Sequence, residues 1–335
     1  MKLQQPLGDA VEKVLTPPVC FCWTMRGSDA IAANANATPP RFINLRSRRC
    51  RAFQVKTRGA GVDSSFMASS VSLTQVAKTF IRDRTSISVL HNLSFTTTPG
   101  EFVVLLGPSG CGKSTVLRLI GGLETPSTGS VQIGSEAVTS TDDRTAVVFQ
   151  EPRLLPWRTV AGNIALGTNR RRGDDSRLSR TQCRTLGRHL LDQVGLLDTA
   201  SAFPHQLSGG MAQRVALARG LACEPEVLLL DEPFAALDAL TRMRMQELLA
   251  KIWTDRKSTV VLVTHDVDEA LYLADRIIIL GGTPATIVDS INIPAQRPRD
   301  RNDPAFLPLR ARILAHFGLA YEQASSPDFE WEAAD

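Results

Sequence analysis

The chain has 335 residues, of which 43% are hydrophobic and 21% are charged, proportions typical of a soluble globular protein. Its net charge of +4 is unevenly distributed: residues 1–66 hold ten Lys and Arg against four Asp and Glu, a net of +6, and the remainder holds 28 against 30, a net of −2. The nearly neutral remainder gives no electrostatic reason to expect nucleic-acid binding, and no apolar run approaches the ~18 residues of a membrane span.

Residues 1–66 differ in composition from the rest of the chain. They contain two Pro-Pro pairs, the stretch AANANAT and the basic cluster RSRRCR, without a sustained period. This composition favours a disordered or non-native N-terminal extension. The arginines also suit a targeting peptide, but Asp9, Glu12 and Asp29 and the lack of an apolar core argue against one. A third hypothesis places the biological start at Met67, just before the first strand-like segment.

From about residue 70, short apolar segments alternate with helical patterns. The strand-like segments are VSLTQVAKTF at 71–80, FVVLL at 102–106, AVVF at 146–149, VLLLD at 227–231, TVVLVT at 259–264 and RIIIL at 276–280. Residues at helical spacing are Val116, Ile120 and Leu123, then Leu186, Leu190, Val194 and Leu197, then Met245, Leu248, Leu249 and Ile252. This alternation predicts a mostly parallel sheet covered on both faces. The strand-poor stretch from about 155 to 220 predicts a helical insertion.

The segment GPSGCGKST fits the phosphate-loop pattern G-x-x-x-x-G-K-[ST], between an expected strand and an expected helix. Glycines let the backbone curl around a phosphate, and the helix N-terminus offers unpaired N–H groups. Lys113 would reach the β- and γ-phosphates, and Ser114 would offer its hydroxyl to Mg²⁺. The alternative is a glycine-rich turn that binds nothing. The predicted nucleotide contacts are Gly107, Pro108, Ser109, Gly110, Cys111, Gly112, Lys113, Ser114 and Thr115.

Polar residues follow three of the expected strands. VLLLDE ends in two carboxylates, of which Asp231 would hold Mg²⁺ through a water and Glu232 would polarise the attacking water. Gln150 and His265 follow two other strands, at the end where ligands gather in open α/β sheets. Gln150 is predicted to reach Mg²⁺ or the lytic water, and His265 the γ-phosphate. The plainer alternative is a set of solvated loop residues.

Two further segments carry helix-start signals. Asp266, with Glu269 three residues later, suits a capping box. LSGGMAQR at 207–214 places a glycine pair before an expected helix, where backbone N–H groups can approach an anion and Ser208 adds a hydroxyl. The simpler interpretation of the second segment is a plain helix-capping turn.

These motifs occur in a defined order, which is GPSGCGKST, Gln150, LSGGMAQR, VLLLDE, AALD and His265. In this order they resemble the ATPase subunit of ABC transporters, over about residues 70–290. The resemblance implies an α/β P-loop NTPase fold, with a RecA-like, mostly parallel sheet core, an antiparallel β N-terminal part and a helical subdomain at about 155–220. It implies an ABC ATPase domain at 70–295 and a short helical tail at 296–335.

The resemblance also implies ATP and Mg²⁺ as cofactors and a second copy of the chain as partner. Ser208, Gly209 and Gly210 of one copy would cap the γ-phosphate of the ATP held by the other copy's phosphate loop. The resemblance assigns Mg²⁺ binding to Ser114, Gln150 and Asp231. It assigns catalysis to Glu232, His265 and Gln150. ATP would thus close the pair, and hydrolysis would let it open.

Two assignments depend on position within the resemblance. Asp238, in FAALD, matches the loop that crosses the interface between copies, although Ala235 or Ala236 replaces its usual serine. Phe80 matches the aromatic that stacks on adenine; a lone phenylalanine is as readily a core residue.

The resemblance further implies an integral membrane permease and, indirectly, an extracytoplasmic solute-binding protein as partners. The chain would act at the cytoplasmic face of the cell membrane. Residues 150–167 contain Leu154, Leu155 and Trp157 in a loop-like segment, which suits a docking site for the permease or, alternatively, packing into the chain's own core. The chain is similar to importer ATPases for nitrate, taurine and aliphatic sulfonates, and we favour sulfonates. Other hypotheses are a soluble ABC ATPase and a nucleotide-binding module without turnover.

Overall fold

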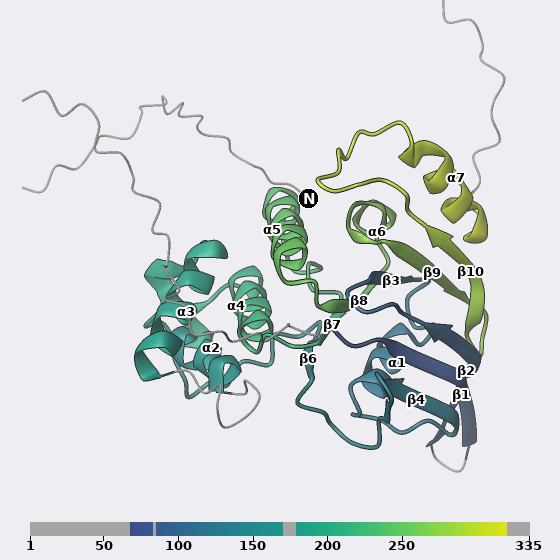
Figure 1. The fold of residues 1–335 in the computed structure, drawn as a ribbon, viewed down its shortest axis with the longest axis horizontal. Helices are drawn as coiled ribbons and strands as arrows, with labels where there is room; N and C mark the ends of the chain where they lie inside the picture. Colours follow the sequence, from purple (N-terminus) through teal and green to yellow (C-terminus); the bar gives the residue numbers. More distant parts are fainter. Residues whose placement is uncertain (1–67, 83–84, 170–178, 320–335) are drawn as a thin grey trace, which may run out of the picture. The chain divides into compact units, whose positions relative to one another are not determined.

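The computed structural model describes residues 68–82, 85–169 and 179–319, which belong to one compact unit (Figure 1). The predicted extension at 1–66, the proposed start at Met67 and the last part of the predicted tail lie outside the described residues. Among the described residues, no helix has both the length and the apolar character needed to cross a bilayer.

A six-stranded sheet forms the centre of the fold, with the strand order β10-β9-β3-β8-β7-β6. Its members are β3 (Phe102–Leu106), β6 (Thr145–Val148), β7 (Val227–Asp231), β8 (Thr259–Thr264), β9 (Arg276–Gly281) and β10 (Thr286–Asn292). All are parallel except β10, which pairs antiparallel with β9 at the edge. The predicted mostly parallel sheet is confirmed.

The N-terminal part forms a second, antiparallel sheet in the order β2-β1-β4-β5. Its strands are β1 (Val71–Arg82), β2 (Thr85–Thr96), β4 (Thr128–Ile133) and β5 (Glu136–Ala137). The residues of one core cluster come from this sheet, from helix α1 (Lys113–Ile120) and from one face of the central sheet. The antiparallel β part predicted before the core is therefore present.

Alternate residues of the central strands belong to two different hydrophobic cores, one on each face of the sheet. Val103 and Leu105 of β3 belong to the core with α1, whereas Val104 and Leu106 belong to the larger core on the other face. This follows because successive strand residues point to opposite faces. Figure 1 shows α5 and α6 on one side of β3, β8 and β7, with α1 and β4 on the other.

The remaining helices follow β6 in the chain. Between β6 and β7 lie α2 (Val160–Asn169), α3 (Arg180–Gln193), η2 (Leu197–Thr199), η3 (Pro204–Gln206) and α4 (Gly209–Ala222); later come α5 (Ala239–Arg256), α6 (Val267–Leu273) and α7 (Phe306–His316). The described residues between β6 and β7 contain helices and no strand. The subdomain and domain boundaries themselves stay predictions.

Two helical predictions extend too far. The face predicted to include Leu197 stops earlier, because α3 ends at Gln193 and Leu197 lies in the separate 3-10 helix η2. Leu123 does not continue the face formed by Val116 and Ile120, because α1 ends at Ile120 and Leu123 is 43% exposed. The cause is the glycine pair that follows: Gly122 has φ +65, and a Cβ there would lie 2.0 Å from a backbone oxygen. The left-handed backbone at this position terminates the helix.

Candidate nucleotide site

The phosphate loop lies between the end of β3 and the start of α1, as the sequence predicts. A Cβ on Gly107 would lie 2.6 Å from the carbonyl oxygen of Leu280, and Gly112 has φ +104 at the helix N-cap. Glycine is required at both positions for these reasons. Lys113 is only 5% exposed, and its Nζ donates to the carbonyl oxygens of Gly107 (2.8 Å) and Pro108 (2.7 Å). The ammonium group is thus held inside the loop that it is predicted to serve.

The structure brings two of the predicted metal ligands into direct contact. The Ser114 hydroxyl donates to Oδ1 of Asp231 at 2.8 Å, although the two residues are 117 positions apart. Burial raises the pKa of Asp231, and the hydrogen bond from Ser114 partly opposes this. A hydroxyl and a carboxylate are oxygen donors of the kind that Mg²⁺ prefers, with phosphate oxygens and water completing its shell. The donor set therefore fits Mg²⁺ held jointly with a nucleotide.

Three predicted catalytic residues meet beyond the ends of β6, β7 and β8, which are neighbours in the sheet. The Gln150 amide donates to Oε2 of Glu232 at 3.2 Å, and Nδ1 of His265 lies 3.2 Å from Oε1 of the same carboxylate. Glu232 has φ +44, a left-handed backbone that is uncommon for a non-glycine residue. Its backbone N–H donates to the Val263 carbonyl (3.0 Å), which fixes this conformation.

Ser208 is the N-cap of α4 and accepts the Met211 N–H at 3.3 Å, so the plain capping role is present. Ser208 and Gly209 are exposed, and a Cβ on Gly209 would meet no atom within 4 Å. Figure 1 shows α4 and α1 on opposite sides of β6 and β7. Ser208 and Gly209 therefore present an open backbone surface on a different part of the molecule from the phosphate loop, whereas Leu207 and Gly210 are half-buried.

Comparison with known proteins decides the family. Residues 90–235 match the family described as ABC transporter. The aliphatic sulfonates import ATP-binding protein SsuB 2 of Burkholderia lata is 45% identical over 250 residues, covering 75% of this chain and 87% of the relative. SsuB 1 of Pseudomonas syringae pv. syringae is 49% identical over 234 residues (70% and 92%), and SsuB of Bacillus subtilis is 43% identical over 251 residues (75% and 94%).

The chain belongs to the ABC transporter family. The dimeric post-hydrolysis state of the ATP-binding cassette MJ0796, bound to ADP and Pi, matches 68% of this chain and 100% of its own, with TM-score 0.61 and 35% identity. The predicted P-loop NTPase fold is confirmed. As an ABC ATPase subunit, the chain binds ATP and couples its hydrolysis to transport.

Two other residues of the predicted nucleotide site do not belong to the group formed by Gln150, Glu232 and His265. Asp238 is the N-cap of α5 and accepts the Thr241 N–H at 3.0 Å, and this bond lowers the pKa of its carboxyl. Phe80 is half-buried on β1, and Nζ of Lys78 lies 4.8 Å from its ring centroid. Their predicted roles toward the nucleotide and the partner copy stay predictions.

The predicted docking segment divides between core and surface. Leu154 is half-buried and packs against the larger core, which matches the alternative of folding back. Trp157 is 71% exposed. Tryptophan is enriched at protein interfaces, so its exposure agrees with the predicted docking role, which stays a prediction.

Sequence reasoning missed the residue that shapes this loop. Asn163, fully buried in α2, accepts the Leu155 N–H (2.8 Å) and donates to the carbonyls of Leu155, Arg158 and Thr159. The available signal was an amide at a core-facing position of an apolar helix, which demands several hydrogen-bond partners.

The predicted capping box at α6 is only half correct. Asp266 Oδ1 accepts the Glu269 N–H at 3.1 Å, but the Glu269 carboxylate accepts the Thr264 hydroxyl (2.9 Å) instead of returning to the N-cap. Glu269 is 5% exposed, and burial raises its pKa to about 8. Burial therefore disfavours the charged form of this side chain near neutral pH.

Proposed function

We propose that this chain is the ATP-hydrolysing subunit of an importer for aliphatic sulfonates, acting at the cytoplasmic face of the cell membrane. The observation that carries the proposal is the similarity, at 43–49% identity, to three proteins named as aliphatic sulfonates import ATP-binding proteins. Nitrate and taurine are the alternative substrates. A binding protein and a permease would select among these oxyanions, because the described site is built for nucleotide.

The residues of the site divide the work on Mg·ATP. The phosphate-loop amides and Lys113 would bind the β- and γ-phosphates, and Ser114, Gln150 and Asp231 would hold Mg²⁺. When bound, Mg²⁺ neutralises charge on the phosphate oxygens. Glu232 would orient and deprotonate the attacking water. His265, whose Nδ1 lies 3.2 Å from the Glu232 carboxylate, would hold that carboxylate in place and contact the γ-phosphate.

A second copy would complete each site. Ser208, Gly209 and Gly210 would cap the γ-phosphate held by the partner, and Asp238 would cross the same interface. Support comes from the exposure of Ser208 and Gly209 and from the dimeric relative bound to ADP and Pi. A γ-phosphate contacted from both sides favours the closed dimer, and ADP lacks those contacts.

The partners outside the dimer are membrane permease subunits and, through them, an extracytoplasmic solute-binding protein. The exposed Trp157 supports docking to the permease through segment 150–167. The chain after residue 66 is nearly neutral, so its charge gives no reason to propose a nucleic-acid partner.

Reconstitution with the cognate permease in liposomes tests this function. We expect ATP hydrolysis to rise when the binding protein is loaded with an alkanesulfonate, and to change little with nitrate, taurine or no ligand. The binding protein without ligand is the control for nonspecific stimulation. Stimulation by nitrate or taurine alone would replace the substrate, and hydrolysis indifferent to the permease would favour a soluble ABC ATPase.

A further inference from the structure

We propose that Arg242 is a positioning residue that couples the loop carrying Asp238 to His265 of the same copy, through an ion pair with Asp266. The inference rests on the proposed two-copy ATP site, because Asp238 is placed there against the partner. Arg242 would thereby contribute to cooperativity between the two ATP sites of the dimer.

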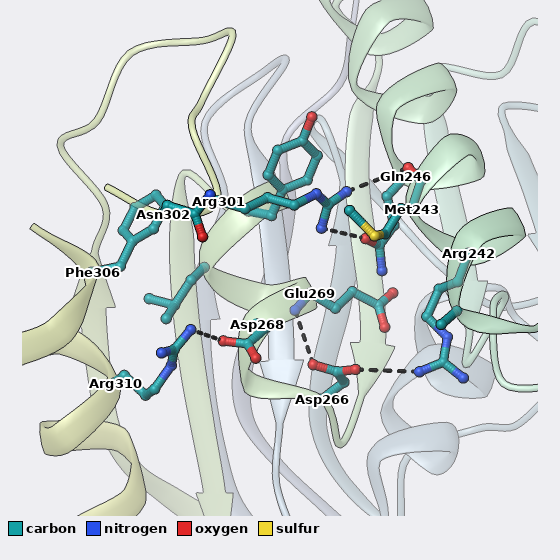
Figure 2. Close-up of a pocket in the computed structure, with 13 residues that line it drawn as sticks. Arg242, Met243, Gln246, Asp266, Asp268, Glu269, Arg301, Asn302, Phe306 and Arg310 are labelled. Atoms are coloured by element: carbon teal, nitrogen blue, oxygen red, sulfur yellow. Dashed lines mark hydrogen bonds and ion pairs between the residues drawn. The ribbon is translucent and has the colours of Figure 1, made fainter. Parts of the chain in front are cut away.

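Arg242 lies in the first turns of α5, immediately after the loop in question. Its guanidinium donates to the Leu237 carbonyl at 3.2 Å, and its backbone N–H donates to the Asp238 carbonyl at 2.8 Å. Its other terminal nitrogen lies 3.6 Å from Oδ2 of Asp266. Figure 2 shows the side chain extending from α5 toward the start of α6. One residue therefore joins the loop to a second element.

Asp266 adjoins His265 and is itself tightly held. Its Oδ1 accepts the Glu269 N–H (3.1 Å), and its backbone N–H donates to the Thr264 hydroxyl (3.0 Å). These two hydrogen bonds tie Asp266 to the end of β8 and the start of α6. A displacement of the Asp266 carboxylate would therefore be transmitted to the end of β8. His265, the next residue back, lies 3.2 Å from Glu232. The path from Asp238 to the catalytic carboxylate is continuous.

The surroundings select Asp266 as the partner of Arg242. Among the described residues the carboxylate that Arg242 contacts is Asp266, and burial raises the pKa of the neighbouring Glu269 to about 8, which disfavours the charged form of Glu269 near neutral pH. The pair borders a cavity of about 320 Å³ between α5, α6 and the segment 301–310 (Figure 2). Arg242 Nε has no hydrogen-bond partner among the described residues. Open space and a spare donor allow the guanidinium to shift when the loop moves, which a close-packed site would prevent.

The pair is poorly suited to a purely stabilising role. Both side chains are about one-third exposed, and the contact is long at 3.6 Å. Partly exposed pairs of this kind contribute little to folding stability. Removing the charge should therefore change communication between sites far more than it changes the fold.

The test uses Arg242→Gln and Asp266→Asn, with Arg244→Gln as the matched control on an exposed position of the same helix. Asparagine caps helices as well as aspartate does, so the second variant removes only the charge. Hydrolysis is measured against ATP concentration. We expect the Hill coefficient to fall from above one to about one and kcat to fall about 5- to 10-fold in both variants. Arg244→Gln should match the parent.

Three further measurements distinguish a loss of coupling between the two ATP sites from a general loss of folded structure. The double variant should be no worse than either single one, because the two residues act through each other. Thermal midpoints should stay within ~3 °C of the parent. ATP-driven dimerisation in a Glu232→Gln background should persist. An unchanged Hill coefficient and kcat in Asp266→Asn, or multiplied losses in the double variant, would overturn the inference. Absence of an ATP-driven dimer in Glu232→Gln protein with Arg242 and Asp266 intact would instead overturn the proposed two-copy site.

Discussion

Replacing Glu232 by glutamine should leave ATP binding intact while slowing hydrolysis by about 10²- to 10⁴-fold. Glutamine keeps the size of the side chain, so the contacts that Gln150 and His265 make at 3.2 Å retain a partner. It cannot accept the proton of the attacking water. ATP then persists at both sites, and the closed dimer accumulates because it alone binds the γ-phosphate from two sides.

Two measurements check this prediction: phosphate release at saturating ATP, and size-exclusion chromatography with and without ATP. The matched control is Glu151→Gln, which changes an exposed carboxylate next to Gln150 and should behave as the parent. Hydrolysis by Glu232→Gln at the parental rate would show that another group activates the water. A slow variant that stays monomeric in ATP would break the link between the nucleotide and closure.

Replacing Lys113 by alanine should weaken ATP binding by at least about 100-fold. In the described structure its Nζ donates to two loop carbonyls, at 2.8 and 2.7 Å. These bonds hold the ammonium in the loop, where it would exchange them for phosphate oxygens. Each charge-assisted bond contributes about 1.5–3 kcal/mol, and the loss of two accounts for the expected fall.

Calorimetric titration with ATP measures the effect of Lys113→Ala. Because Lys113 is buried, Lys113→Met is measured in parallel to keep the side-chain volume, and the exposed Lys251→Ala serves as control. Both Lys113 variants should lose affinity while remaining folded by circular dichroism. Parental affinity in a folded Lys113→Met protein would exclude the lysine from phosphate binding.

The strands were the most predictable part of the fold. FVVLL, VLLLD and TVVLVT coincide with β3, β7 and β8 residue for residue. These runs are buried on both faces of a parallel sheet, so every position is apolar and polar residues mark the ends. The same logic brought Gln150, Glu232 and His265 together, because parallel strands place their carboxyl ends at one edge.

Side-chain partners from distant segments were not predictable. Glu269 has the spacing of a capping box, yet its carboxylate accepts from Thr264 on the preceding strand. Local rules describe what a residue offers to its own helix and cannot weigh a competing buried hydroxyl. The Arg242–Asp266 pair and the Asn163 network have the same origin, since the partners meet only after the elements pack.

We propose that each ATP is held by two copies, by the phosphate loop of one and residues 208–210 of the other. Mixing Lys113→Ala protein with Ser208→Arg protein tests it most directly, because each should be inactive alone. In the mixed dimer both defects fall on one site, and the other site keeps an intact Lys113 and an intact Ser208. We expect ATP hydrolysis to reappear on mixing. A mixture that forms dimers but stays as inactive as its components would contradict it.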